Sequence, residues 1–250
     1  MPGMTASSRS TGRRSPQFGI DAPMVPLTMT GIGAAAVVAA IVFPWRSRGW
    51  RWIRWWVGLQ GIGTLAQAAF FYHTTLRGKL RVWDRELDAL HLRGDERLLD
   101  LGCGRGAVLI AAARRLPNGR VDGVDLWRSV DQSGNEINAT RANTTAAGVA
   151  ERVHLHTADM TALPFDDDSF DVVTAALAIH NIPSADGRRQ AVAEAVRVLK
   201  PGGRLRIADF RYTSDYRDWI GPSATVRALG PGYWYGGPWA MTRMVEATTS

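Results

Sequence analysis

The most informative part of this chain is Asp100-Leu-Gly-Cys-Gly-Arg-Gly106, which directly follows the apolar pair Leu98-Leu99. The apolar residues before the glycines predict a buried strand, and Val108-Leu-Ile-Ala-Ala-Ala113 predicts a helix after them. Glycine occurs where the backbone needs a positive φ or where a ligand approaches closely. The three glycines therefore predict a turn wrapped around a bound molecule, with the free amides of a helix N-terminus beside it.

The spacing of the glycines alone leaves the bound molecule open. Gly102, Gly104 and Ala107 match the G-x-G-x-x-G/A fingerprint of dinucleotide-binding proteins, so a nicotinamide-dependent oxidoreductase is one hypothesis. Asp100 argues against it, because a carboxylate two residues before the first glycine suits a cationic ligand and not a pyrophosphate.

Two further acids lie at the ends of the next predicted strands. Asp125 ends the strand predicted over 120–125, where a carboxylate can accept hydrogen bonds from both hydroxyls of a ribose. Asp159 follows the strand predicted over 153–157 and can accept a hydrogen bond from an exocyclic amine. The predicted ligand carries a ribose and a positive group, with little or no phosphate.

These residues, together with several motifs that follow them, resemble the class I S-adenosylmethionine-dependent methyltransferases. The further motifs are Asp159-Met160, Leu163-Pro-Phe165, Ser169-Phe-Asp-Val-Val173 and Leu199-Lys-Pro-Gly-Gly203. The resemblance covers about residues 84–250 and implies S-adenosylmethionine as the cofactor. It implies that Asp100 and the glycines hold the methionine part, that Asp125 binds the ribose, and that Asp159 and Met160 bind the adenine. The implied cofactor-binding set is Asp100, Gly102, Cys103, Gly104, Gly106, Asp125, Leu126, Asp159, Met160 and Ala176.

Short apolar strands that alternate with helical patterns predict an α/β fold with parallel strands and helices on both faces. Helices are predicted near 105–116, 131–148 and 186–199, with a charged helix and a turn over 78–95. The resemblance implies a Rossmann-like sheet of seven strands in the order 3-2-1-4-5-7-6, whose last two strands lie near 224–229 and 241–247. In open α/β sheets the ligand binds beyond the carboxyl ends of the central strands, which is where the three acids fall.

The first part of the chain predicts one or two hydrophobic helices that anchor the protein to a membrane. Residues 22–45 carry no charge and are long enough to cross a bilayer as a helix, and residues 55–76 are free of Asp, Glu, Lys and Arg. Between them, residues 45–56 combine tryptophan with arginine, which is typical of a membrane interface. The predicted organisation is a disordered basic tail over 1–21, a membrane-anchor region over 22–76 and a methyltransferase domain over 77–250.

The hydrophobic segments also fit other interpretations. A cleaved signal peptide and an amphipathic helical pair packed on the soluble domain are alternatives to an anchor. An anchor would form either two spans or one span over 24–45, with the second segment lying flat or re-entrant. The cofactor is cytosolic, so the catalytic domain is expected to face the cytoplasm. Two spans would then place the four arginines of 46–54 outside, against the positive-inside bias.

Charge and cysteine usage argue against several partners. Residues 1–83 hold ten of the 30 Lys and Arg but one of the 23 acids, so the net charge of +7 comes from this part. The rest of the chain is nearly neutral, which argues against nucleic acid as a partner and against RNA as a substrate. The single cysteine, Cys103, forms no internal disulfide and argues against an arsenic methyltransferase. Asp166-Asp-Asp168 is predicted to be a solvated turn, so no metal is expected, and the oligomeric state stays open.

His180, in Ala178-Ile-His-Asn-Ile182 just past the fourth strand, is the predicted catalytic residue. Histidine titrates near neutrality and can take a proton from a hydroxyl or amine acceptor; a role in packing or in the substrate pocket is the alternative. Asn181 is predicted to orient the substrate. The aromatic stretch Tyr233-Trp-Tyr235 with Trp239 is predicted to wall a pocket for an apolar or aromatic acceptor, and Tyr233 and Trp234 are its predicted substrate residues. Hairpin packing or membrane contact is the alternative.

The predicted function is therefore the transfer of a methyl group from S-adenosylmethionine to a small, lipophilic acceptor at a membrane surface, with membrane lipids as partners. Three alternatives are kept. They are the nicotinamide-dependent oxidoreductase, a non-catalytic module that binds the cofactor, and a methyltransferase for protein or RNA. The sequence leaves the acceptor atom open.

Overall fold

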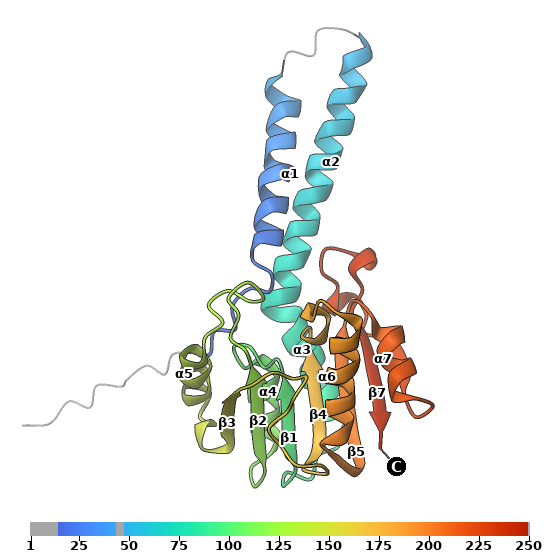
Figure 1. The fold of residues 1–250 in the computed structure, drawn as a ribbon. Helices are drawn as coiled ribbons and strands as arrows, with labels where there is room; N and C mark the ends of the chain where they lie inside the picture. The colour runs from blue at the N-terminus through green and yellow to red at the C-terminus, as the bar shows by residue number, and fades with distance from the viewer. Residues whose placement is uncertain (1–14, 44–47, 250) are drawn as a thin grey trace, which may run out of the picture.

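A seven-stranded mixed sheet forms the centre of the protein, whose computed structural model describes residues 15–43 and 48–249 (Figure 1). The strands are β1 (Arg97–Leu101), β2 (Arg120–Asp125), β3 (Val153–Thr157), β4 (Phe170–Ala176), β5 (Leu199–Asp209), β6 (Thr225–Ala228) and β7 (Arg243–Thr248). Their order is β3-β2-β1-β4-β5-β7-β6; β1 to β5 run parallel, and β7 is antiparallel to β5 and β6. The predicted fold class and strand order are confirmed.

Helices cover both faces of the sheet. They are α3 (Lys79–Asp88), α4 (Ala107–Arg115), α5 (Ile137–Ala147), α6 (Ala185–Arg197) and α7 (Thr213–Ile220), with 3-10 turns η2 (Ala150–Arg152), η3 (Ile179–Asn181), η4 (Pro231–Tyr233) and η5 (Pro238–Ala240). Successive side chains of a strand point to opposite faces. Leu98 therefore packs in a core cluster with α3 and α4, whereas Leu99 packs in a second cluster with α6 and α7.

Helix α5 begins later than the sequence predicts. The predicted helix starts at residue 131, but residues 131–136 are a loop in which Gly134 has a φ of +62°. Asn135 in this loop donates through Nδ2 to Oδ1 of Asp125 at 3.2 Å. Glycine at a positive φ interrupts the helix, and the amide of Asn135 bonds the carboxylate at the end of β2 instead.

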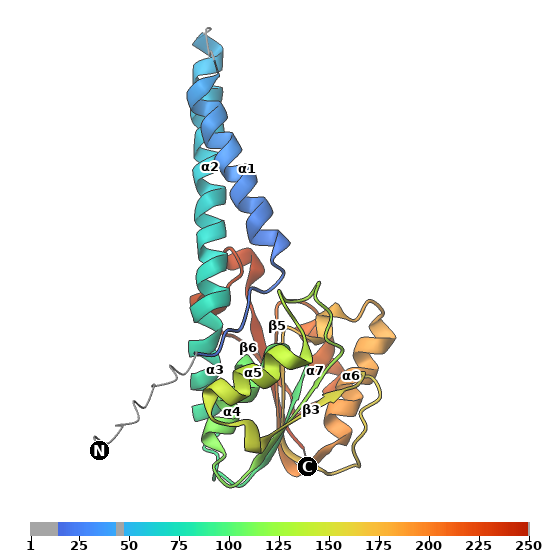
Figure 2. The ribbon, with the colours of Figure 1, turned by 90° about the vertical axis from the view of Figure 1, so that its left-hand side faces the viewer.

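Two antiparallel helices, α1 (Met24–Val42) and α2 (Arg48–His73), form a hairpin that extends away from the sheet (Figures 1 and 2). Glycines let the two helices approach closely, since a Cβ at Gly61 would lie 2.9 Å from the carbonyl oxygen of Gly33. Within residues 15–43 and 48–249, α1 is the helix that is long and apolar enough to cross a membrane, with a mean hydropathy of 2.0. One N-terminal hydrophobic helix is thus confirmed, and α2 is a longer helix of lower hydropathy.

The chain passes from this hairpin into the sheet domain without a break. A π-helical turn, η1 (Thr74–Gly78), joins α2 to α3, so that the three elements follow one another directly. A Cβ at Gly78 would lie 2.0 Å from the carbonyl oxygen of Gly232, so this turn packs on the backbone of η4. The domain boundary predicted at residue 77 lies inside this continuous helical segment.

The N-terminal segment corrects the prediction of a disordered tail over residues 1–21. Residues 1–14 lie outside the described residues, but residues 17–22, here called the strap, run along the loop 131–133. The N–H of Ser133 donates to the carbonyl of Ile20, and the N–H of Ile20 donates to Oγ of Ser133 at 2.8 Å. Phe18 packs against the core cluster of α3 and α4. The hydrogen bonds between Ile20 and Ser133 bridge 113 positions of sequence, so local composition does not reveal them.

Candidate active site

A cavity of about 720 Å³ lies beyond the carboxyl ends of β1, β2 and β4, at the base of the hairpin. The predicted site residues that line it are Asp100, Gly102, Cys103, Gly104, Asp125, Leu126, Asp159, Met160, Ala176, His180, Asn181 and Tyr233. Gly106 does not line the cavity but is the N-cap of α4. Trp234 does not line it either, and Tyr235 does. The structure thus brings most of the predicted set together, while the role of each residue stays a prediction.

The glycine turn between β1 and α4 is fixed on β2. The N–H groups of Gly102 and Cys103 donate to the carbonyl of Val124 at 2.8 and 3.1 Å. Gly102 has a φ of +64°, and a Cβ there would lie 2.3 Å from the Cβ of Ala178. Only glycine fits this contact, because a side chain would meet the η3 turn that carries the predicted catalytic residue.

Asp100 is a buried carboxylate at the end of β1. Thr174 on β4 donates through Oγ1 to its Oδ1 at 2.7 Å. Burial, together with the charge of nearby Asp125, raises the pKa of Asp100 to about 7, against the lowering effect of the Thr174 hydrogen bond. A bound cation would favour the ionised carboxylate, because an opposite charge lowers the pKa of an acid.

Asp125 organises the turn as well as facing the cavity. Its Oδ2 accepts from the N–H of Gly104 at 2.8 Å, and its Oδ1 accepts from the N–H of Trp127 at 2.6 Å. The carboxylate therefore has a fixed orientation at the end of β2. Asp159, which follows β3, is exposed. Its Oδ1 accepts hydrogen bonds from the N–H and the hydroxyl of Thr161.

S-adenosylmethionine, the cofactor that the resemblance implies, fits the residues of this cavity. Its cationic groups suit Asp100, a buried carboxylate in the cavity wall. Gly102 and Gly104 also line the cavity, so the turn offers backbone to a ligand there. The acid at the end of β2 suits a ribose.

A further carboxylate, that of Asp209, lies beside His180, and the sequence analysis missed it. Nδ1 of His180 is 2.9 Å from Oδ1 of Asp209, the fully buried residue that ends β5. Oδ2 of Asp209 accepts from the N–H of His180 at 3.2 Å and from the hydroxyl of Tyr216 at 3.3 Å. The ring of Phe210 packs edge-on against His180 with centroids 4.6 Å apart. The available signal was an acid at the carboxyl end of a central strand, the same signal that identified Asp125.

Another part of the cavity wall is apolar and comes from the hairpin and from residues 231–241, here called the aromatic loop. Val25 of α1, Phe71 of α2 and Tyr235 line the cavity, and the rings of Phe71 and Tyr235 meet edge-on at 4.9 Å. Tyr233 is buried, and its hydroxyl accepts from Nε1 of Trp83 at 3.2 Å. The hairpin therefore contributes directly to the site and is not only a separate appendage.

Two other groups, His156 and the acidic turn over 166–168, lie away from the cavity. His156 on β3 contacts the buried Asp122, with Nε2 2.8 Å from Oδ1. Asp167 pairs with Arg197 at 2.6 Å, which accounts for part of the acidic turn over 166–168. Neither His156 nor Asp167 lines the cavity.

Comparison with known proteins gives one family match. The sequence profile of a family described as a methyltransferase domain matches residues 98–203, which run from β1 into β5. The matched segment contains the glycine turn and His180. It excludes the hairpin, the strap and Asp209.

Characterised relatives cover the same part of the chain. The 27-O-demethylrifamycin SV methyltransferase of Amycolatopsis mediterranei is 36% identical over 156 residues, which are 61% of this chain and 52% of that protein. The ubiquinone/menaquinone biosynthesis C-methyltransferase UbiE of Dinoroseobacter shibae is 37% identical over 134 residues, which are 53% of this chain and 50% of that protein. The chain thus spans about half the length of these relatives.

The fold is shared with a solved structure, a SAM dependent methyltransferase from Aquifex aeolicus. The two agree with a TM-score of 0.51 at 16% sequence identity, over 67% of this chain and 89% of that chain. This likeness concerns the fold alone.

Proposed function

Because the chain belongs to the class I S-adenosylmethionine-dependent methyltransferases, we propose that it transfers a methyl group from S-adenosylmethionine to a small, lipophilic acceptor at a membrane surface. One observation carries this proposal. A single cavity joins Asp100 of the cofactor residues, His180 of the predicted catalytic residues and the apolar side chains of Val25 and Phe71 at the base of the hairpin.

The chain's own residues bind and align the reactants. S-adenosylmethionine supplies an electrophilic methyl group on a sulfonium. Asp100 and the glycine turn hold the methionine part, Asp125 binds the ribose, and Asp159 with Met160 contacts the adenine. Alignment of donor and acceptor in a closed site supplies about 7–11 kcal/mol toward the barrier of such a displacement.

His180 takes the proton from the acceptor in this proposal, and Asp209 is its positioning residue. The Asp209 carboxylate lies 2.9 Å from Nδ1, at ion-pair distance but without a hydrogen bond to it, so its charge lies beside the ring that would accept the proton. The backbone N–H of His180 and the hydroxyl of Tyr216 hold Asp209 in turn. These partners give the fully buried carboxylate a fixed place beside the imidazole.

The apolar wall supports a lipophilic acceptor. Val25, Phe71 and Leu80 line the cavity opposite the polar cofactor residues, and Tyr235 and Ala240 of the aromatic loop complete this side. The relatives named above act on a rifamycin derivative and serve the biosynthesis of ubiquinone and menaquinone. Pockets that combine an apolar lining with a few polar groups are typical sites for such small molecules.

A membrane location is supported by the surface of the hairpin. Met24, Leu27 and Val42 of α1 expose 67, 58 and 73% of their surface, and α2 exposes Trp52 and Trp55 near its far end. Trp45 and Arg46 of the predicted interface stretch lie outside the described residues. We infer that the hairpin inserts in the bilayer, with the sheet domain on the cytoplasmic side. The close packing at Gly33 and Gly61 favours the two-span layout, because a flat α2 could not follow α1 along its length.

The experiment uses membranes that contain the full chain, washed at alkaline pH to remove peripheral proteins and then supplied with S-adenosylmethionine carrying a labelled methyl group. The expected result is that the chain stays with the membranes and that label appears in the organic extract. Membranes with Asp100→Ala are the control and should transfer no label. Release of the chain by the wash contradicts the membrane location. Bound cofactor without any labelled product contradicts the transferase and favours the non-catalytic module.

A further inference from the structure

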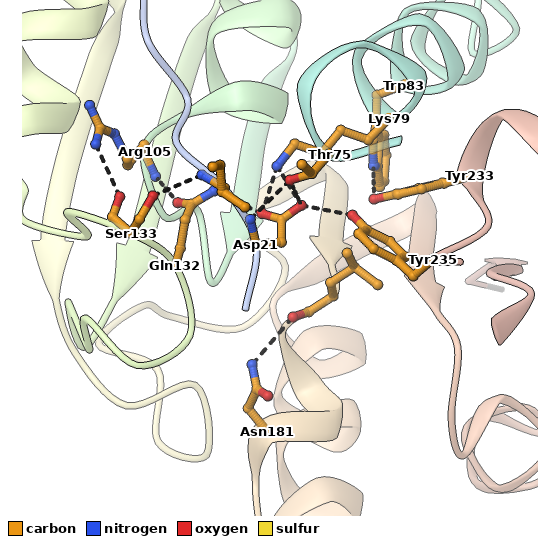
Figure 3. A network of polar contacts seen from close by, with 12 residues as sticks. Asp21, Thr75, Lys79, Trp83, Arg105, Gln132, Ser133, Asn181, Tyr233 and Tyr235 are labelled. Carbon is orange, nitrogen blue, oxygen red and sulfur yellow. Dashed lines mark hydrogen bonds and ion pairs between the residues drawn. The ribbon is translucent and has the colours of Figure 1, made fainter. Parts of the chain in front are cut away.

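A cluster of polar side chains meets at Asp21, in the strap and at the wall of the cavity (Figure 3). Lys79 of α3 donates through Nζ to both carboxylate oxygens, at 2.6 and 2.7 Å. The hydroxyls of Thr75 and Tyr235 donate to Oδ2 at 2.8 and 2.7 Å. Nε2 of Gln132 donates to Oδ1 at 3.0 Å. Asp21 thus joins the strap to η1, α3, the aromatic loop and the loop before α5.

The central ion pair of this cluster is shielded from water. The side chain of Lys79 is 7% exposed and that of Asp21 is 17% exposed. Burial raises the pKa of Asp21. The charge of Lys79 and the hydrogen bonds that Asp21 accepts outweigh burial, so the pKa of Asp21 lies below its ordinary value. Asp21 is therefore an ionised carboxylate, which accepts hydrogen bonds and donates none.

This chemistry fixes the orientation of Gln132. A carboxylate requires the NH₂ end of the amide, so Oε1 of Gln132 must point the other way. There it accepts from the backbone N–H of Arg105 at 2.9 Å, within the glycine turn (Figure 3). A Cβ at Gly104 would lie 2.6 Å from the same Oε1, so the amide also packs against the turn. From the other side, Asp125 accepts from the N–H of Gly104 at 2.8 Å.

We propose that Asp21 is a positioning residue of the cofactor site, which orients Gln132 and thereby sets the backbone of the glycine turn and the affinity for S-adenosylmethionine. The proposal depends on the assignment of this turn to the cofactor. Asp21 lies outside the family match over 98–203, so this support belongs to the N-terminal extension of the chain. Since α1 begins three residues after Asp21, the strap also ties the cofactor turn to the hairpin.

The test measures binding of S-adenosylhomocysteine to the full chain by calorimetry and the KM for S-adenosylmethionine. Asp21→Asn can present its own NH₂ group to Gln132 and release the amide, so the dissociation constant should rise about tenfold, as for loss of a charged hydrogen bond. Gln132→Leu should raise the dissociation constant by the same factor. It leaves the Asp21–Lys79 pair intact, so it tests the role of Gln132 even if Asp21→Asn folds poorly. The double variant should be no worse than either single variant.

Thr75→Val is the matched control. It removes a donor to the other oxygen of the same carboxylate and the acceptor of the Asp21 backbone N–H, but it keeps the Gln132 contact, so it should change thermal stability but not cofactor affinity. A positioning role also predicts that Asp21→Asn raises the KM for S-adenosylmethionine while kcat at saturation stays the same.

Two results would overturn the positioning role of Asp21, and a third would overturn the assignment of the glycine turn to the cofactor. Unchanged affinity in Asp21→Asn and Gln132→Leu overturns the positioning role. An equal loss in Thr75→Val overturns it too, since the strap would then act only as a structural tether. Binding that survives Asp100→Asn instead shows that the glycine turn was wrongly assigned to the cofactor.

Discussion

Replacing His180 with alanine is expected to lower kcat by about 10²–10⁴-fold, the range that a positioned general base contributes. His180 lines the cavity, and Oδ1 of Asp209 lies 2.9 Å from its Nδ1. Alanine removes proton transfer and leaves Asp100 and the glycine turn in place, so the affinity for S-adenosylhomocysteine should stay the same. The measurement is the steady-state rate of methyl transfer to the acceptor recovered in the organic extract, at saturating S-adenosylmethionine.

His156→Gln is the matched control for this substitution. His156 also contacts a buried carboxylate, Asp122 at 2.8 Å, but it lies outside the cavity, so kcat should not change. Asp209→Asn should lower kcat with an unchanged KM for S-adenosylmethionine, since it disturbs the imidazole and not the cofactor residues. A kcat that is the same in His180→Ala and the native chain contradicts the general-base role. The apolar acceptor would then react without loss of a proton to this histidine.

The second large effect is expected at Gly102. Gly102→Ala places a Cβ 2.3 Å from the Cβ of Ala178, and neither atom belongs to a flexible side chain. The turn must shift away from η3, so the affinity for S-adenosylhomocysteine should fall about 10–100-fold, as expected for overpacking that displaces backbone. Calorimetry on the full chain measures the dissociation constant.

Gly148→Ala separates steric displacement from backbone strain. Gly148 has a φ of +71°, close to the +64° of Gly102, but a Cβ there meets nothing within 4 Å. Both substitutions incur the cost of about 1–2 kcal/mol for a left-handed residue with a Cβ. Only Gly102→Ala should lose cofactor affinity. Equal affinities in the two variants would contradict the close approach of the turn to the ligand.

The sequence predicts the features whose signals are local. The glycine turn, the strand before it and the acids at 100 and 125 lie within one βαβ unit, so their spacing alone predicts that they meet. Tyr233 and Trp234, of the aromatic stretch 233–235, were predicted as substrate residues, whereas Tyr233 and Tyr235 line the cavity. Alternation along an irregular loop has no fixed period, so the sequence does not predict which side chains of this stretch face the cavity.

The missed residues depend on contacts between distant segments. Asp21 bonds Tyr235, which lies 214 positions later, and Gln132, which lies 111 positions later. Its own surroundings are polar, basic and rich in serine, so composition predicts disorder for this segment. Burial of an ion pair and packing of Phe18 order the strap, and neither appears in a local window of the sequence.

The most direct measurement is the affinity of the full chain for S-adenosylmethionine at about pH 6 and about pH 8, beside that for NAD. Burial raises the pKa of Asp100 to about 7, so its carboxylate ionises across this window and attracts a cation more strongly at the higher pH. The dissociation constant should therefore fall about tenfold from the lower to the higher pH in the native chain. In Asp100→Asn the dissociation constant should not fall in this way. The variant therefore also separates the effect of Asp100 from titration of the ligand's own amino group. NAD should not bind. Binding of NAD, or an affinity for S-adenosylmethionine that Asp100→Asn leaves unchanged at both pH values, would contradict the cofactor site.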